Sequence, residues 1–304
     1  MDSLNENLMA DHLIQVSGVA TQTFPNQTLY MVGLPIGNLG DITLRAIWIL
    51  SKVDIIAAED TRETKKLLEK YGLNVRLMSV REHNEHIGAQ QIIDCLAKGM
   101  RVALVTDAGT PAVSDPGAKV AHLVSEAGFR IMPIPGCSAV ITALSASGIE
   151  SSTFTFVGFL PPQTKARREQ LDHWLSKSSA TVFYEAPHRI KEFLQDIAQR
   201  IESQRRVVIG RELTKKFEEF TYLTGGTLAT WATALEPKGE FVVLVDGRTQ
   251  DMSTTSLSDE QKRWLAELTG QLPLSKLAAL AAKVTGLSRS EIYSYLLESQ
   301  EQKA

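Results

Sequence analysis

Cysteine is scarce in this 304-residue chain, which contains only Cys95 and Cys137. The two are far apart and have no paired spacing, which argues against both a disulfide framework and a zinc site. His83 and His86 resemble metal ligands only superficially, because no third ligand accompanies them, and we interpret them as solvated loop residues. We therefore predict no metal and a reducing, cytoplasmic environment.

Long apolar runs and an excess of one charge are also missing. No run approaches the ~18 residues of a membrane-spanning helix, and the start, MDSLNENLMADH, lacks the pattern of a signal peptide. The 32 Lys and Arg nearly balance the 35 Asp and Glu, for a formal net charge of -3. We expect a protein that is neither secreted nor in a membrane, and any RNA partner would need a local basic face.

The usual nucleotide-phosphate motifs are missing as well. The first glycine-rich segment, GLPIGNLGD, has neither the dinucleotide spacing nor the Lys-Ser or Lys-Thr of a P-loop. Pro35 removes a backbone donor where a pyrophosphate cradle needs N–H groups. The segment therefore suits apolar or adenosine contact better than anion binding, although an ordinary tight turn is the other interpretation.

What the chain does have is a set of abrupt glycine and proline turns, each at the end of an apolar run. They follow Leu29 to Pro35 (GNLGD), Arg101 to Thr106 (DAGTPAVSDPG) and Phe129 to Ile134 (PGCSA). In an open α/β sheet a ligand sits outside the carboxyl ends of the strands, where turn backbone can approach it. We expect the chemistry where Pro35, Asp107 and Gly136 meet.

Alternating strand and helix patterns predict an α/β protein with two main domains. Residues 1–26 are polar and aperiodic and are interpreted as a flexible tail outside the fold. Residues 27–137 are expected to form a first α/β domain with a mostly parallel sheet, and residues 138–248 a second, less regular one.

Residues 249–304 are expected to hold a polar linker and three short helices. Gly286 would end the second of these, and the third would begin with a capping box and hydrophobic staple formed by Leu287, Ser288, Glu291 and Ile292. The shape is similar to a helix-turn-helix. Because acidic and basic residues balance there, the pattern favours packing or dimer contacts over unaided phosphate binding.

Charged residues stand at two strand-to-helix junctions. After the second strand, Asp60 fits a helix cap, which leaves Glu59 and Arg62 free to face a cleft. In the second domain Glu185 and His188 occupy the matching junction, where an acid-base pair and a surface helix start are both open.

Two aspartates lie in the second turn. Asp115, followed by proline, is predicted to be a structural helix cap. Asp107 directly follows a strand and could either bind a ligand ribose or amine, or close an Asx turn.

Basic residues gather in the second domain, where they would form a rim facing the cleft, as an RNA backbone requires. Solvated surface charge is the equal alternative. The residues are Lys165, Arg167, Arg168, Arg205, Arg206, Arg211, Lys215 and Lys216.

The three turns, together with GFLPP, YEAPHR and RELTKKFEE, resemble the ribosomal RNA branch of the tetrapyrrole-methylase (class III methyltransferase) superfamily. The similarity runs from about Thr28 to Val245 and continues through the helical tail. Thr106 stands where serine is usual, and Cys137 where a small residue or proline is usual. The resemblance implies two α/β domains with a cofactor cleft between them and a small helical C-terminal domain.

The same resemblance implies S-adenosylmethionine as cofactor and methyl transfer to the ribose 2′-hydroxyl of a decoding-centre cytidine in small-subunit (16S) ribosomal RNA. The substrate would be that RNA within the 30S subunit, and the protein would be a homodimer. Carried over by motif, the cofactor contacts would be Leu34, Pro35, Asp107, Gly109, Thr110, Val113, Ser138 and Ala139, joined in the second domain by Tyr184, Leu213 and Gly239.

Methyl transfer from a sulfonium to a hydroxyl needs near-attack geometry and a group that accepts the proton, without a metal. Glu59 or Glu185 is our hypothesis for that base, from residue type and junction position. Arg62, Arg211 or Lys215 would contact RNA or the developing alkoxide.

Three other functions compete with this one. A tetrapyrrole methyltransferase would want an apolar, macrocycle-sized cleft rather than a basic rim. A non-catalytic ribosome-assembly factor would hold RNA on the rim without transferring a methyl group. A dinucleotide oxidoreductase fails on the first glycine pattern.

Overall fold

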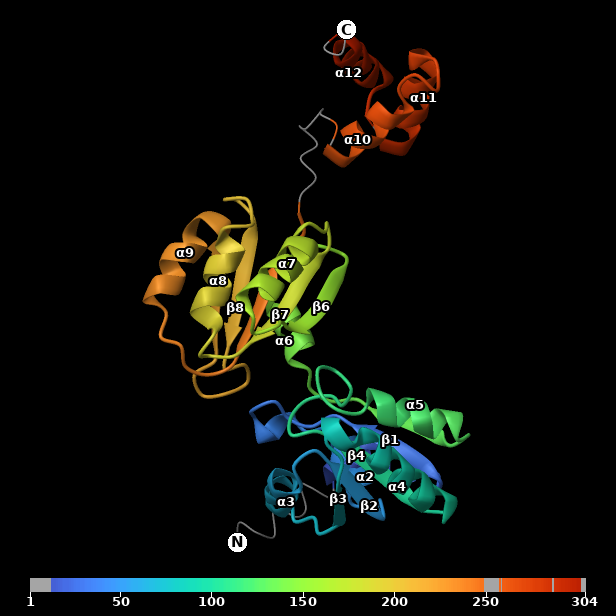
Figure 1. Ribbon diagram of the computed structural model, residues 1–304. Coiled ribbons are helices and arrows are strands. Elements are labelled where there is room, and N and C mark those ends of the chain that lie inside the picture. Colours follow the sequence, from blue (N-terminus) through green and yellow to red (C-terminus); the bar gives the residue numbers. More distant parts are fainter. Residues whose placement is uncertain (1–11, 249–256, 258, 286, 302–304) are drawn as a thin grey trace. The chain divides into compact units, whose positions relative to one another are not determined.

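The computed structural model describes residues 12–248, 257, 259–285 and 287–301 (Figure 1). The chain divides into two compact units, Met1–Arg248 and Thr249–Ala304, and each is described by itself. Within the described residues, no helix has the length and apolar character needed to span a membrane.

The first sheet of the larger unit is parallel throughout and has the strand order β3-β2-β4-β1-β5. Parallel neighbours place every carboxyl end at one edge of the sheet, so the turns that follow these strands gather there. The strands are β1 (Thr28–Val32), β2 (Ile55–Ala58), β3 (Arg76–Ser79), β4 (Arg101–Val105) and β5 (Arg130–Ile134).

Helices cover both faces of this sheet, which explains why β2 is buried along its whole length. On one face Ile49 and Leu68 pack with Tyr30, and on the other Ile92 and Val120 pack within a separate cluster. The helical elements are η2 (Leu39–Asp41), α2 (Leu44–Leu50), α3 (Thr61–Lys70), η3 (Glu82–Asn84), α4 (Glu85–Ala97) and α5 (Ala118–Glu126).

The chain before β1 is partly built into this core. Residues 12–17 are helical, and Val19 of η1 (Val19–Thr21) and Phe24 are buried among the residues that cover β1. Arg101 Nε donates a hydrogen bond to the Phe24 carbonyl oxygen at 2.8 Å. The prediction that residues 1–26 lie outside the fold is therefore wrong for residues 19–24, and residues 1–11 lie outside the described part.

The second sheet is mixed, with the strand order β6-β7-β10-β8-β9. Only β6 and β7 run parallel, whereas β10 is antiparallel to both β7 and β8, and β9 is antiparallel to β8. This mixed direction accounts for the less regular sequence pattern. The strands are β6 (Phe154–Phe159), β7 (Ala180–Glu185), β8 (Arg206–Arg211), β9 (Glu219–Thr224) and β10 (Phe241–Val245).

Helix α6 (Ala139–Ser147) leads the chain from the first sheet to the second, directly after the turn that follows β5. Val140 and Ala143 of α6 pack against Val182 and Leu244 on one face of the second sheet. The other face is covered by α7 (Thr164–Leu175), α8 (Ile190–Ala198) and α9 (Gly225–Ala234).

The smaller unit consists of α10 (Asp259–Leu268), α11 (Leu274–Thr285) and α12 (Arg289–Glu301) around a core that includes Leu277 and Ile292. The Ser288 hydroxyl accepts the Glu291 N–H at 3.2 Å, as expected of the predicted cap. The predicted helices beyond the linker are confirmed, while Gly286 and most of the linker lie outside the described residues.

Candidate functional site

The three glycine and proline turns meet at the carboxyl edge of the first sheet, as predicted. A Cβ placed on Gly136 would lie only 2.6 Å from the Gly33 carbonyl oxygen, so the first and third turns touch through bare backbone. The first and second turns are joined by a pair of backbone hydrogen bonds between Leu34 and Gly109, of 2.8 and 3.1 Å. Only glycine permits the close backbone approach seen between Gly33 and Gly136.

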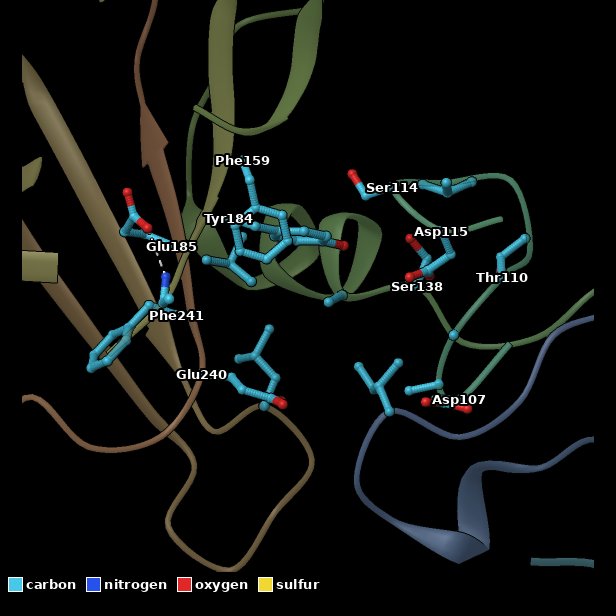
Figure 2. A pocket seen from close by; sticks show the side chains of 18 of the residues that line it. Asp107, Thr110, Ser114, Asp115, Ser138, Phe159, Tyr184, Glu185, Glu240 and Phe241 are labelled. Carbon is cyan, nitrogen blue, oxygen red and sulfur yellow. Dashed lines mark hydrogen bonds between the residues drawn. The ribbon is translucent and has the colours of Figure 1, made fainter. Parts of the chain in front are cut away.

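A cavity of about 500 Å³ opens between this edge and the second sheet (Figure 2). Its size falls within the roughly 300–1,000 Å³ that is typical of ligand pockets. Among the predicted site residues it is lined by Glu59, Asp107, Gly109, Thr110, Val113, Ser138, Ala139, Tyr184, Glu185 and Leu213.

Three predicted cofactor residues do not line the cavity. Leu34 and Pro35 are buried within the first turn, away from the cavity wall. Gly239 has a φ of +87° and packs against Glu212, since a Cβ there would lie 2.6 Å from the Glu212 Cγ. A cofactor contact by these residues stays a prediction.

Several residues of the cavity wall were not predicted. They are Ile36, Ala108, Ser114, Asp115, Phe159, Ala186, Pro187, Glu240, Phe241 and Val242. The prediction that Asp115 caps a helix is wrong, because α5 begins later, with Gly117 as its N-cap at a φ of 135°. The Gly117 N–H is satisfied by the Glu85 carboxylate at 2.6 Å, which leaves Asp115 to face the cavity.

Every charged residue that the structure describes on the cavity wall is acidic. Near the first sheet, the Asp107 N–H donates to Glu59 Oε2 at 3.4 Å, and Asp107 Oδ1 accepts the Asp60 N–H at 3.0 Å. Asp107 thus ties two turns together. Burial raises the pKa of Glu59, and withdrawal from water, with the nearby charges of Glu59 and Asp107, raises the pKa of Asp115 to about 6.

Asp60 caps α3, as predicted, and also holds Arg62. The Asp60 carboxylate accepts the Arg62 N–H at 2.8 Å and pairs with the Arg62 guanidinium at 2.6 Å. These bonds hold the pKa of Asp60 well below its usual range. Arg62 is exposed and outside the cavity wall, which corrects the expectation that it is free to face the cleft.

Glu185 is buried and serves the backbone around the cavity. Its Oε1 accepts the Ala186 N–H at 2.8 Å and lies 3.2 Å from Arg189 Nε. Arg189 also donates to the carbonyl oxygens of Leu160 and Pro161, at 2.8 and 3.2 Å. In Figure 2 the Glu185 carboxylate lies on the side away from Asp107 and Asp115.

The geometry therefore makes Glu185 a positioning residue for the end of β6. Burial raises its pKa, although the Ala186 N–H and Arg189 oppose the shift. His188, the other half of the proposed acid-base pair, is exposed just before α8.

Only part of the predicted basic rim lies on the surface of the described structure, because Arg167 and Arg205 are used inside the fold. Arg167 is buried and pairs with Asp196 at 2.7 Å. Arg205 is also buried and donates to the carbonyl oxygens of Leu175 and Asp246, at 2.6 and 2.8 Å. Lys165, Arg168, Arg206 and Lys216 are exposed, and none of the predicted rim residues lines the cavity.

The two remaining candidate cations hold a loop beside the cavity. Lys215 Nζ lies 2.9 Å from Glu212 Oε1 and 2.8 Å from Glu240 Oε2, and Arg211 Nε donates to the Lys238 carbonyl oxygen at 2.8 Å. Glu212 and Thr214 have φ values of 49° and 66°, a left-handed conformation that is costly without glycine. Lys215 thus holds a strained loop in place through its ion pairs with Glu212 and Glu240. It does not line the cavity.

Comparison with known proteins agrees with this architecture. Residues 28–229 match the family Tetrapyrrole (Corrin/Porphyrin) Methylases, and residues 255–300 match the RsmI C-terminal HTH domain. The chain belongs to the tetrapyrrole methylase family.

Two curated relatives of the chain carry the same name. The chain is 45% identical over 282 residues to "Ribosomal RNA small subunit methyltransferase I" of Vibrio cholerae, covering 91% of this chain and 98% of that protein. It is 43% identical over 274 residues to the protein of the same name from Escherichia coli O157:H7, covering 90% and 95%.

Solved structures share the fold at low sequence identity. The cobalt precorrin-4 methyltransferase CbiF aligns with a TM-score of 0.52 and 18% identity, over 72% of this chain and 95% of that one. The methyltransferase CobJ gives a TM-score of 0.54 and 19% identity, over 73% and 93%. These likenesses confirm the two-sheet fold.

Proposed function

We propose that this protein is an S-adenosylmethionine-dependent methyltransferase of small-subunit ribosomal RNA. The support comes from relatives with that name at 43–45% identity over nearly their whole length. The observation in the structure that carries the proposal is a ligand-sized cavity at the strand ends whose described charged residues are all acidic.

The cavity suits a sulfonium cofactor. S-adenosylmethionine is cationic at its sulfur and at its amino group, and carboxylates nearby stabilise such charges. The apolar residues Ile36, Val113 and Leu213 give a surface for the adenosine, and bare backbone at Gly109 allows close approach. When bound, this cofactor supplies an electrophilic methyl group.

The acidic wall also separates the competing functions. A nicotinamide dinucleotide carries a pyrophosphate, and a uroporphyrinogen-type substrate carries several carboxylates, so both would be repelled by Glu59, Asp107 and Asp115. An RNA substrate is compatible with the acidic cavity, because only one nucleoside needs to enter it while the phosphates stay outside. The exposed Lys165 and Lys216 are available for those phosphates.

The finer proposal is transfer to the ribose 2′-hydroxyl of a decoding-centre cytidine in 16S RNA, within the 30S subunit, by a cytoplasmic homodimer. The chain would hold the hydroxyl in line with the methyl group and accept its proton. Glu59 lines the cavity and stays a candidate base, whereas Glu185 is engaged with Arg189. Arg62, which is exposed, stays a candidate RNA contact.

The test is to incubate the protein with labelled S-adenosylmethionine and small ribosomal subunits that lack the modification. The RNA is then digested and the label located on base or ribose. Methyl on the 2′-hydroxyl of a single cytidine is the expected result. Absence of transfer while calorimetry still shows cofactor binding would overturn the RNA substrate, and methylation of uroporphyrinogen in the same assay would support the tetrapyrrole alternative. Subunit binding without transfer would favour the assembly factor.

A further inference from the structure

Phe159 is an exposed aromatic residue on the wall of the cavity. Its side chain stands at the end of β6 and 57% of its surface is exposed, although phenylalanine is normally buried. The ring packs edge-on against Tyr184, with centroids 5.6 Å apart, and Tyr184 packs in the same way against Phe156 at 4.9 Å. The Phe159 ring therefore packs against Tyr184, while the rest of its surface is exposed.

The backbone that carries Phe159 is held rigidly. Arg189 donates to the carbonyl oxygens of the next two residues, Leu160 and Pro161, and is itself paired with the buried Glu185. An exposed apolar ring on a backbone held by a buried ion pair is a preorganised surface for a ligand.

Asp115 lies at the same end of the cavity. The residue before it, Ser114, touches the residue before Phe159, since a Cβ on Gly158 would lie 2.7 Å from Ser114 Oγ. Figure 2 shows Phe159 and Tyr184 on one side of the cavity and Ser114 and Asp115 on the other. The contact between the two segments therefore places a flat apolar ring and a carboxylate on facing sides of one cavity.

The Asp115 carboxylate makes no hydrogen bond or ion pair with any residue that the structure describes. It is held by an unusual backbone, because Ala112 and Ser114 have left-handed φ values of 70° and 64°. The titratable groups that act on it are Glu59 and Asp107, whose charges help to raise its pKa. Burial, with a smaller contribution from the Asp115 charge, raises the pKa of Tyr184 to about 12. None of these groups is a cation that would neutralise Asp115.

We infer that Phe159 and Asp115 form the acceptor half of the cavity, where the base of one extruded nucleotide stacks on Phe159 and Asp115 accepts the proton of its ribose hydroxyl. The inference rests on the proposed function and deepens it, with Asp115 in place of Glu59 as the base, because Glu59 already accepts the Asp107 N–H. Base stacking on an aromatic ring is the common way in which proteins hold an unstacked nucleotide.

The step balances without a further reactant. The hydroxyl oxygen forms the O–CH₃ bond as the S–CH₃ bond breaks, and the electron pair of that bond goes to sulfur, which becomes a neutral thioether. The hydroxyl proton passes to Asp115, which is exposed and returns it to water. A carboxylate with a pKa of about 6 is mostly ionised at neutral pH and is a stronger base than an ordinary aspartate.

The test uses the full chain with S-adenosylmethionine and small ribosomal subunits that lack the modification. Phe159→Ala is expected to raise KM for the subunit about 10-fold, the size of one lost base stack. Phe159→Trp should restore it, and the cofactor Kd should stay within about 2-fold. Phe154→Ala is the matched control, because Phe154 lies at the other end of β6, is 45% exposed and is outside the cavity wall.

Asp115→Asn is expected to lower kcat about 100-fold or more at neutral pH, with cofactor affinity retained. Wild type is expected to lose rate as the pH falls through about 6, and Asp115→Asn should remove that loss. An Asp115→Asn variant that keeps both kcat and this acid limb would overturn the base assignment. A Phe159→Ala variant that weakens cofactor binding but leaves KM for the subunit unchanged would overturn the stacking assignment. If wild type itself transfers no methyl group, the proposed function has failed instead.

Discussion

Gly33 and Gly136 are in backbone contact, and a side chain on either would collide with the other. The Cβ of a residue at position 136 would lie 2.6 Å from the Gly33 carbonyl oxygen, and that of a residue at position 33 would lie 2.8 Å from the Gly136 Cα. The contact closes the first turn onto the third at the edge of the cavity. Backbone proximity at this point therefore determines the shape of this edge of the cavity.

Gly136→Ala should accordingly disturb both stability and cofactor binding. We expect a loss of about 2–3 kcal/mol in the free energy of unfolding, because the added methyl group meets backbone that cannot move aside. Gly99→Ala is the control, since Gly99 has a φ of +86° but open space around it, and only the conformational cost of about 1 kcal/mol applies. Denaturation and calorimetry with S-adenosylmethionine would check this, and equal cofactor affinity in the two variants would contradict it.

The place of the cavity could be predicted because its cause is local. Glycine and proline directly after apolar strands mark turns, and parallel strands bring such turns to one edge. Gly109 and Gly136 were found in this way. Asp115 was missed because Asp-Pro is a strong cap pattern, and only the φ of 135° at Gly117 moves the helix start beyond it.

The role of the cations could not be predicted, because charge in a sequence does not tell where its partner lies. Arg167 pairs with Asp196, which is 29 residues later in the chain. Arg205 donates to the carbonyl oxygen of Asp246, which is 41 residues later. Both bonds depend on tertiary packing. Phe159 was likewise passed over, because exposure of an aromatic residue is a property of the folded surface.

The buried pair of Arg167 and Asp196 predicts a large stability effect. Asp196→Ala would leave the Arg167 guanidinium, with a side chain only 3% exposed, without its 2.7 Å partner and paired only with the exposed Glu192 at 3.4 Å. We expect a loss of about 3–5 kcal/mol in the free energy of unfolding, because a buried charge that loses its buried partner is costly. Urea denaturation would measure it.

The double variant Arg167→Met with Asp196→Leu should recover much of that stability, because both charges are then removed. Glu63→Ala breaks an exposed pair with Lys66 and is the control, for which no measurable change is expected. Equal effects of Asp196→Ala and Glu63→Ala would refute the argument.

Lys215 is expected to act on cofactor binding through Glu240. Lys215→Met leaves the Glu212 and Glu240 carboxylates facing each other without a cation, so the strained loop around Thr214 can relax away from the cavity. We predict a roughly 5-fold weaker Kd for S-adenosylmethionine by calorimetry. Lys216→Met is the control, because Lys216 is exposed over the Phe217 ring. A Kd equal to that of wild type would rule out the idea that Lys215 supports cofactor binding by holding this loop.

The raised pKa of Asp115 predicts how the stability of the protein depends on pH. Its pKa is about 6 in the folded protein and 3.8 for an unperturbed aspartate, so the unfolded chain loses its proton first as the pH rises. The folded state binds more protons between those values, and the contribution of Asp115 to stability falls across that interval. The penalty is complete above pH 6.

Asp115→Asn removes this penalty. The Tm of the variant minus the Tm of wild type should therefore grow from pH 4 to pH 7, as measured by calorimetry without ligand. The size of the effect is moderated by solvent, since Asp115 is exposed at one side. A difference that stays flat or shrinks over this interval would show that Asp115 is not destabilised by its surroundings.

The small helical unit should unfold on its own. Ile292 is only 1% exposed within the cluster that joins α10, α11 and α12, so Ile292→Ala leaves a cavity there and should cost about 2–4 kcal/mol. Because residues 1–248 form a separate compact unit, their stability should not change. Hydrogen exchange on the full chain would resolve the two, with protection lost in α10–α12 and kept in β1, β4 and β10. Val284→Ala is the control, since Val284 is 76% exposed. Loss of protection in both units after Ile292→Ala would mean that they unfold together.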